Sequence, residues 1–156
     1  MNNSIKRGFS FGLTSGVITT LGLMVGLHSG THLASVVISG ILVIAVADSL
    51  SDALGIHMAE EFENQHTPKE IWTATAVTFL SKLLVAASFI IPILLFNLNT
   101  AIIISIAWGL SLIFIFNFLM AKQQHDKPWH AVAEHLVIAI LVIIATHYLG
   151  DLLARQ

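Results

Sequence analysis

The chain has 156 residues, of which 56% are hydrophobic and only 10% are charged, and its formal net charge is −2. Charged side chains make up about 25% of an ordinary soluble domain, so this composition excludes one and predicts a protein with several membrane spans. The small negative charge excludes a basic nucleic-acid surface, and the absence of cysteine excludes disulfides and thiolate chemistry. We expect no enzyme activity, because no nucleophile, base and orienting group occur at a suitable spacing.

Five segments are apolar over at least the length, about 20 residues, that a spanning helix needs. They cover residues 9–27, 32–58, 71–96, 100–121 and 129–153. We therefore predict an all-α integral membrane protein with one transmembrane domain over residues 1–156 and a short acidic cytoplasmic segment at 59–70. A signal peptide is not expected, because the first apolar run is long, rich in Gly and Thr, and lacks a clean cleavage site.

The basic residues predict the orientation, because cytoplasmic flanks carry an excess of Lys and Arg. If the N-terminus lies inside, Arg155 lies outside and Lys82 lies within a helix. The basic residues on the cytoplasmic side are then Lys6, Arg7, Lys69, Lys122 and Lys127. We predict a multi-pass protein of the cell (inner) membrane, with its N-terminus inside and its C-terminus outside.

Small and hydroxyl residues recur along the first segment. Residues at a spacing of four let membrane helices approach closely, and packing is the simpler interpretation of such a pattern. The glycines at this spacing are Gly8, Gly12 and Gly16, followed by Gly22, Gly26 and Gly30. Ser15 and Thr19 either hydrogen-bond to their own helix or line a polar pathway.

Asp48 and Asp52 lie one helical turn apart in the second segment. An ionisable side chain in a membrane helix is costly, so it is a hypothesis for a functional site by default. Helical geometry places both on one face, which Glu60 and Glu63 continue inward, while His57 points the opposite way.

The end of the second segment and the residues after it are rich in candidate metal ligands. Carboxylate oxygens bind hard divalent cations, and borderline cations also accept imidazole. The candidate metal ligands are Asp52, Asp48, Glu60, Glu63, Glu61, His57 and Met58. For the acidic part, an ordinary solvated helix end is an equally good interpretation.

Lys82 lies within the third segment, which Pro92 is expected to kink near its outer end. At 1.5 Å per residue, Lys82 and Asp48 lie about 16 and 15 Å from the inner ends of their helices. We therefore predict an Asp48–Lys82 ion pair, which leaves Asp52 as the freer carboxylate. Glu134 in the fifth segment is a further candidate for a proton relay, although a hydrogen bond to His130 explains it more simply.

Several stretches together resemble the vacuolar iron transporter family. They are TSGVITT at 14–20, SLSDALGI at 49–56, FLSK at 79–82, IPIL at 91–94 and THYLG at 146–150. The resemblance covers nearly the whole chain and keeps the order of the five helices. It implies a homodimer with its ion path at the subunit interface, which exports Fe²⁺ or Mn²⁺ from the cytoplasm in exchange for protons. The metal is then a transported substrate, and no permanently bound cofactor is implied.

Four positions depart from the family pattern. Ser15 stands where the family has an aspartate, Asp52 where it has a methionine, Ile56 where it has a glutamate and Lys82 where it has an aromatic residue. Exchanging a thioether for a carboxylate favours Mn²⁺-like ions over softer ones.

Two other functions remain open from the residues alone. The chain could transport another solute, with the Asp48–Lys82 pair as a proton-switched gate. It could instead be a non-transporting membrane scaffold that dimerises through its glycine faces, with Asp48–Lys82 as a structural ion pair. In each case the expected partners include membrane lipid and a second copy of the chain, and none includes nucleic acid.

Overall fold

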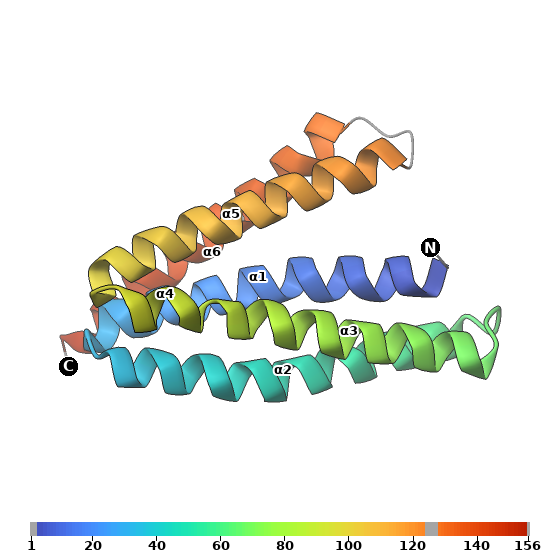
Figure 1. Cartoon of the computed structure of the whole chain (residues 1–156), viewed down its shortest axis with the longest axis horizontal. Coiled ribbons are helices and arrows are strands. Elements are labelled where there is room, and N and C mark those ends of the chain that lie inside the picture. The colour runs from blue at the N-terminus through green and yellow to red at the C-terminus, as the bar shows by residue number, and fades with distance from the viewer. Residues whose placement is uncertain (1–2, 124–127, 156) are drawn as a thin grey trace.

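The computed structural model describes residues 3–123 and 128–155, and these are almost entirely helical (Figure 1). The helices are α1 (Asn3–Thr31), α2 (Ala34–Phe62), α3 (Pro68–Ser88), α4 (Ile90–Leu95), α5 (Leu98–Gln123) and α6 (Pro128–Ala154). Helices α3 and α4 form one span, so five spans are long and apolar enough to cross a membrane. By length and composition the chain is therefore a multi-pass membrane protein, with its two ends at opposite ends of the bundle.

The helices extend further than the apolar segments predicted. Most of the predicted connection at 59–70 is helical, because α2 continues to Phe62 and α3 begins at Pro68. Thr67 starts α3 by accepting a hydrogen bond from the backbone N–H of Glu70, whose carboxylate accepts one from the backbone N–H of Thr67. Lys127, which was assigned to the cytoplasmic side, lies outside the described residues.

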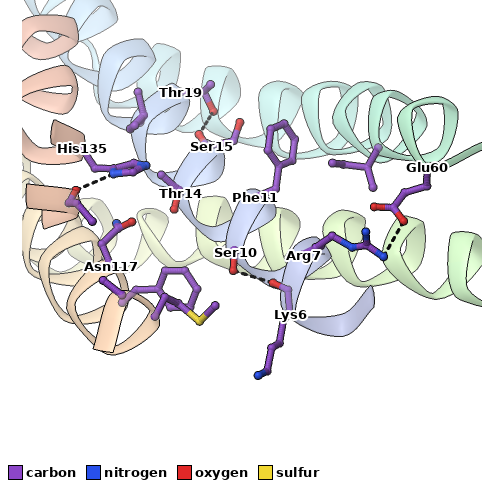
Figure 2. Close-up of a pocket in the computed structure, with 16 residues that line it drawn as sticks. Lys6, Arg7, Ser10, Phe11, Thr14, Ser15, Thr19, Glu60, Asn117 and His135 are labelled. Carbon is purple, nitrogen blue, oxygen red and sulfur yellow. Dashed lines mark hydrogen bonds and ion pairs between the residues drawn. The ribbon is translucent and has the colours of Figure 1, made fainter. Parts of the chain in front are cut away.

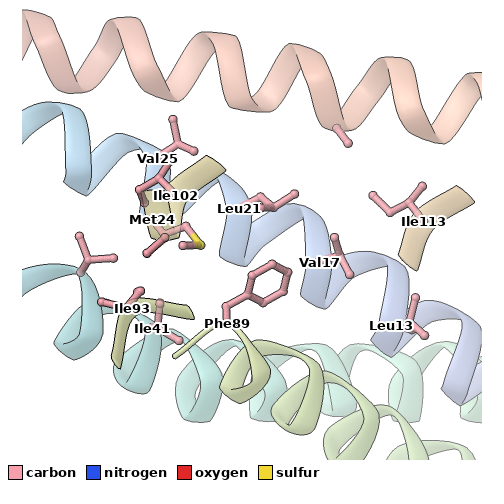
Figure 3. Packing of buried hydrophobic residues seen from close by; sticks show 13 residues of the cluster. Leu13, Val17, Leu21, Met24, Val25, Ile41, Phe89, Ile93, Ile102 and Ile113 are labelled. Carbon is pink, nitrogen blue, oxygen red and sulfur yellow. The ribbon is translucent and has the colours of Figure 1, made fainter. Parts of the chain in front are cut away.

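The third span breaks where Pro92 was expected to disturb it. Helix α3 ends at Ser88, four residues before Pro92, and α4 begins two residues later. A proline ring clashes with the carbonyl group four residues before it and supplies no N–H for the helix. Phe89 at the break is fully buried in the apolar core, beside Leu21 of α1 and Ile41 of α2 (Figure 3).

Helix α1 lies against α3 and α6, and its glycines make the closest contacts with these two helices. A Cβ atom on Gly8 would lie 2.5 Å from the carbonyl oxygen of Ala74 in α3. A Cβ atom on Gly26 would lie 3.3 Å from the carbonyl oxygen of Thr146 in α6. The first three glycines therefore pack on α3 and the last three on α6. The glycine faces expected to support a dimer in the scaffold hypothesis are thus used within one chain.

Helices α5 and α6 are not parallel to the other three spans. Figure 1 shows that this pair meets α1 near the C-terminal end of the bundle and diverges from it towards the end that carries the N-terminus. The divergence places a cavity beside the N-terminal half of α1.

Candidate functional site

The ionisable residues in the middle of the spans come together in one cluster. Asp48 is the middle residue of α2, with fourteen residues on either side. Lys82 lies near the middle of the span formed by α3 and α4, and its side chain is only 2% exposed. Ser15 from α1 and Asp52 from α2 complete what we call the Lys82 cluster, namely Ser15, Asp48, Asp52 and Lys82.

Lys82 contacts both aspartates. Its Nζ atom lies 2.5 Å from Oδ2 of Asp48 and forms a second ion pair with Oδ2 of Asp52. The Ser15 hydroxyl donates a hydrogen bond of 2.7 Å to Oδ2 of Asp52 and accepts one of 2.9 Å from Lys82 Nζ. The contact predicted between Asp48 and Lys82 is therefore present. The prediction that Asp52 is the freer carboxylate is wrong, because a flexible lysine stem reaches both acids across one helical turn.

The two carboxylates are held differently. Asp52 has an ion pair and a hydrogen bond from Ser15, whereas Asp48 Oδ2 has the ion pair but no partner with hydrogen-bond geometry among the described residues. Their side chains are 27% exposed for Asp48 and 20% for Asp52, so both remain partly open. With every group ionised the cluster carries one more negative than positive charge. A proton or a further cation would balance that charge.

Glu60 and Glu63 lie apart from the Lys82 cluster. Glu60 is buried and pairs with Arg7 of α1 at 3.0 Å. Nε2 of His66 lies 3.4 Å from Glu60 and 3.1 Å from Glu63. The sequence did not indicate Arg7 as a partner, because it is far away in the chain and was assigned only to the orientation signal. Its guanidinium group compensates the charge that was expected to attract a metal ion.

The other predicted ligands do not join either group. Nδ1 of His57 lies 3.0 Å from the Thr75 hydroxyl, and Glu61 and Met58 are exposed. Across residues 3–123 and 128–155, no three His, Asp or Glu side chains form a group that could hold a metal ion. The seven predicted metal ligands are therefore distributed over several places in this single chain.

Glu134 is exposed on α6, and in the described part of the chain it forms neither an ion pair nor the hydrogen bond expected with His130.

Thr19 shows both behaviours considered for it. Its hydroxyl donates a 2.9 Å hydrogen bond to the Ser15 carbonyl oxygen of its own helix, and it also lines a cavity.

This cavity has a volume of about 800 Å³ and is lined mainly by α1, α5 and α6, with Ile56 and Glu60 contributed by α2 (Figure 2). Thr14, Ser15 and Thr19 line it from α1, Asn117 from α5 and His135 from α6. Asn117 and His135 were not predicted as site residues. The available signal was a polar residue on an apolar helix, which sequence alone cannot assign to a cavity rather than to a packed interface.

Comparisons with known proteins returned no match, either to a protein-family model or to a curated protein. They give the resemblance to the vacuolar iron transporters no support. What the sequence and the structure establish together is a five-helix protein of the membrane type with an ionisable cluster at mid-span.

Proposed function

We propose that this protein is a proton-coupled transporter that exports a divalent metal ion of the Fe²⁺ or Mn²⁺ kind from the cytoplasm. The Lys82 cluster is its exchange site. The observation that supports this proposal is the position of one ammonium group between two carboxylates in the middle of the spans. The proposal includes a homodimer in the cell membrane with the N-terminus inside, as the sequence predicts.

A purely structural ion pair would need only one acid. Each ionised group held in a membrane span costs free energy unless it is compensated, and Lys82 can compensate only one carboxylate. The second carboxylate adds cost without adding stability. Such a residue is expected where a positive charge must bind and leave again.

The exchange step follows from this charge balance. A divalent cation takes one oxygen from Asp48 and one from Asp52 in place of the ammonium group. Lys82 gives a proton to water and withdraws as a neutral amine, which buried lysines can do. Two carboxylates and a divalent cation are neutral together, whereas two carboxylates and one ammonium group carry one net negative charge. The site therefore returns to that negative charge when the cation leaves and Lys82 regains a proton. Protons and metal ions therefore compete for the same two carboxylates, and one can be moved against the other.

The test is a flux assay in proteoliposomes with a Mn²⁺ gradient and a pH-sensitive dye inside. We expect Mn²⁺ entry to drive proton movement in the wild type and in Asp151→Asn, which makes the same change at an acid near the C-terminal end of α6, outside the cluster. Asp52→Asn should abolish the movement. Unchanged flux in Asp52→Asn would remove this residue from the mechanism.

A second candidate is a transporter of another solute, with the Lys82 cluster as a proton-switched gate. It is favoured by the absence of any group of three metal-ligating side chains among the described residues. Thermal unfolding distinguishes the two functions. A metal exporter is stabilised by Mn²⁺ in the wild type and not in Asp52→Asn, whereas the gate is indifferent to the metal. A scaffold would show no flux of any ion.

A further inference from the structure

We infer that the cavity between α1, α5 and α6 is a water-filled vestibule that leads from the N-terminal end of the bundle to Ser15. This inference deepens the proposed function, because its role as a route for protons and hydrated cations rests on the exchange site. The vestibule itself is a property of the cavity and is tested without transport.

The cavity runs along α1 from one end of the bundle to the cluster. Its lining begins at Lys6 and Arg7 in the first turns of α1 and extends to Thr19, which is about 20 Å along the helix. Neither Asp48 nor Asp52 belongs to its lining, whereas Ser15 does. Since Ser15 hydrogen-bonds to both Asp52 and Lys82, entry to the cluster from this cavity passes the Ser15 hydroxyl.

The polar groups in the lining favour water over a lipid chain. Asn117 donates one hydrogen bond to the carbonyl oxygen of Ile113, and Nδ1 of His135 donates one to the carbonyl oxygen of Ala131. Oδ1 of Asn117, Nε2 of His135 and the Thr14 hydroxyl make no hydrogen bond within the described part of the chain, and these three side chains lie around the same space in Figure 2. In the hydrocarbon region, polar groups that face a lipid chain would stay unpaired, whereas water satisfies them.

Size and charge fit a hydrated ion better than a bare one. The cavity volume of about 800 Å³ is far larger than the volume of about 30 Å³ that one water molecule takes up in the liquid, so there is room for an ion with its water shell. Arg7 is paired with Glu60, and Figure 2 shows the Lys6 side chain pointing away from the other lining residues. Glu60 also lines the cavity, but its carboxylate is paired with Arg7, so these two charges offset each other. Beyond Ser15, a cation meets the two aspartates, whose negative charge Lys82 balances only in part.

The chain has no cysteine, so single-cysteine variants can be labelled without a background. The probes are Thr14→Cys, Ser15→Cys and Asn117→Cys in lipid vesicles. The controls are Leu84→Cys, on the exposed face of α3 near the level of Lys82, and Ser49→Cys, which is fully buried in α2. Each is treated with a charged, membrane-impermeant thiol reagent and, separately, with an apolar maleimide. Only variants that stay monodisperse are compared. If another variant fails to fold, Thr14→Cys remains, because it breaks no side-chain hydrogen bond of the described residues, unlike Ser15→Cys and Asn117→Cys.

We expect the charged reagent to label the three cavity variants at least tenfold faster than either control, while the apolar reagent also reaches Leu84→Cys. If only the apolar reagent labels the cavity variants, a lipid chain fills the cavity and the inference is overturned. Protection of all three from both reagents also overturns it, because the cavity is then closed. If the charged reagent labels Thr14→Cys but not Ser15→Cys, the cavity does not lead to the Lys82 cluster, and that part of the inference is overturned.

The labelling and flux results separate the two proposals. Fast labelling by the charged reagent in a protein without Mn²⁺ flux leaves the vestibule standing and removes the exporter. Flux without labelling removes the vestibule and leaves the exporter.

Discussion

Replacing Lys82 by methionine tests whether this residue holds two acids or one. Methionine has a similar length and no charge, so Lys82→Met keeps most of the packing and removes the cation. The variant leaves Asp48 and Asp52 one helical turn apart on the same face of α2, each without its ion-pair partner.

The expected loss of stability follows from burial. Removing one partner of a buried ion pair costs about 3–5 kcal/mol, because an uncompensated charge remains. The Lys82 side chain is 2% exposed, but the acids are 27% and 20% exposed, so water relieves part of the penalty. We therefore expect a loss near the lower end, about 3 kcal/mol. Adding Asp48→Asn or Asp52→Asn removes one uncompensated charge, and adding both should recover most of the loss.

The assay is unfolding of the purified protein, followed by tryptophan fluorescence, as a double-mutant cycle. Lys69→Met changes an exposed lysine on the same helix and should have little effect. Each second substitution should couple to Lys82→Met by about 0.5–3 kcal/mol, with the double variant more stable than the sum of the single changes predicts. If adding Asp52→Asn lowers the stability of Lys82→Met further, Lys82 does not compensate Asp52, and the assignment of Asp52 to the Lys82 cluster is wrong.

Two further predictions concern stability. Gly12→Ala should destabilise the protein by about 1–3 kcal/mol, because its Cβ atom would lie 2.7 Å from the Thr78 carbonyl oxygen. Gly55→Ala should be neutral or slightly stabilising, because nothing lies within 4 Å of its Cβ position. Equal melting temperatures for the two variants would contradict the close packing of α1 on α3. Arg7→Gln should lower the melting temperature by leaving the buried Glu60 uncompensated, and Glu60→Gln in the same chain should restore it; no restoration would mean that Arg7 acts through some other contact.

The helices could be predicted because each span carries its own signal. Long apolar runs indicate the five spans, and Pro92 indicates the break between α3 and α4. The ends of the helices could not be predicted from hydropathy, because a helix continues into polar residues for as long as its backbone hydrogen bonds and caps are satisfied. Thr67 and Glu70 show this at the start of α3.

The site was predictable only where depth decided it. Equal depth paired Asp48 with Lys82, because two charges at one level in a membrane have few other partners. Depth could not exclude Asp52, since the lysine stem spans a helical turn. Nor could it reveal the pairing of Arg7 with Glu60 or the cavity at Asn117, because both depend on how helices far apart in the sequence are arranged around α1.

The number of protons released when Mn²⁺ binds tests the exchange step most directly. It is obtained by titration calorimetry of the purified protein in two buffers with different ionisation enthalpies. We predict release of about one proton per Mn²⁺ from the wild type, because metal binding and protonation compete for the same groups. Lys82→Arg keeps the positive charge but cannot give up its proton, so it should bind Mn²⁺ far more weakly and release none. Binding without proton release in the wild type, or equal release in Lys82→Arg, would contradict an exchange at Asp48, Asp52 and Lys82.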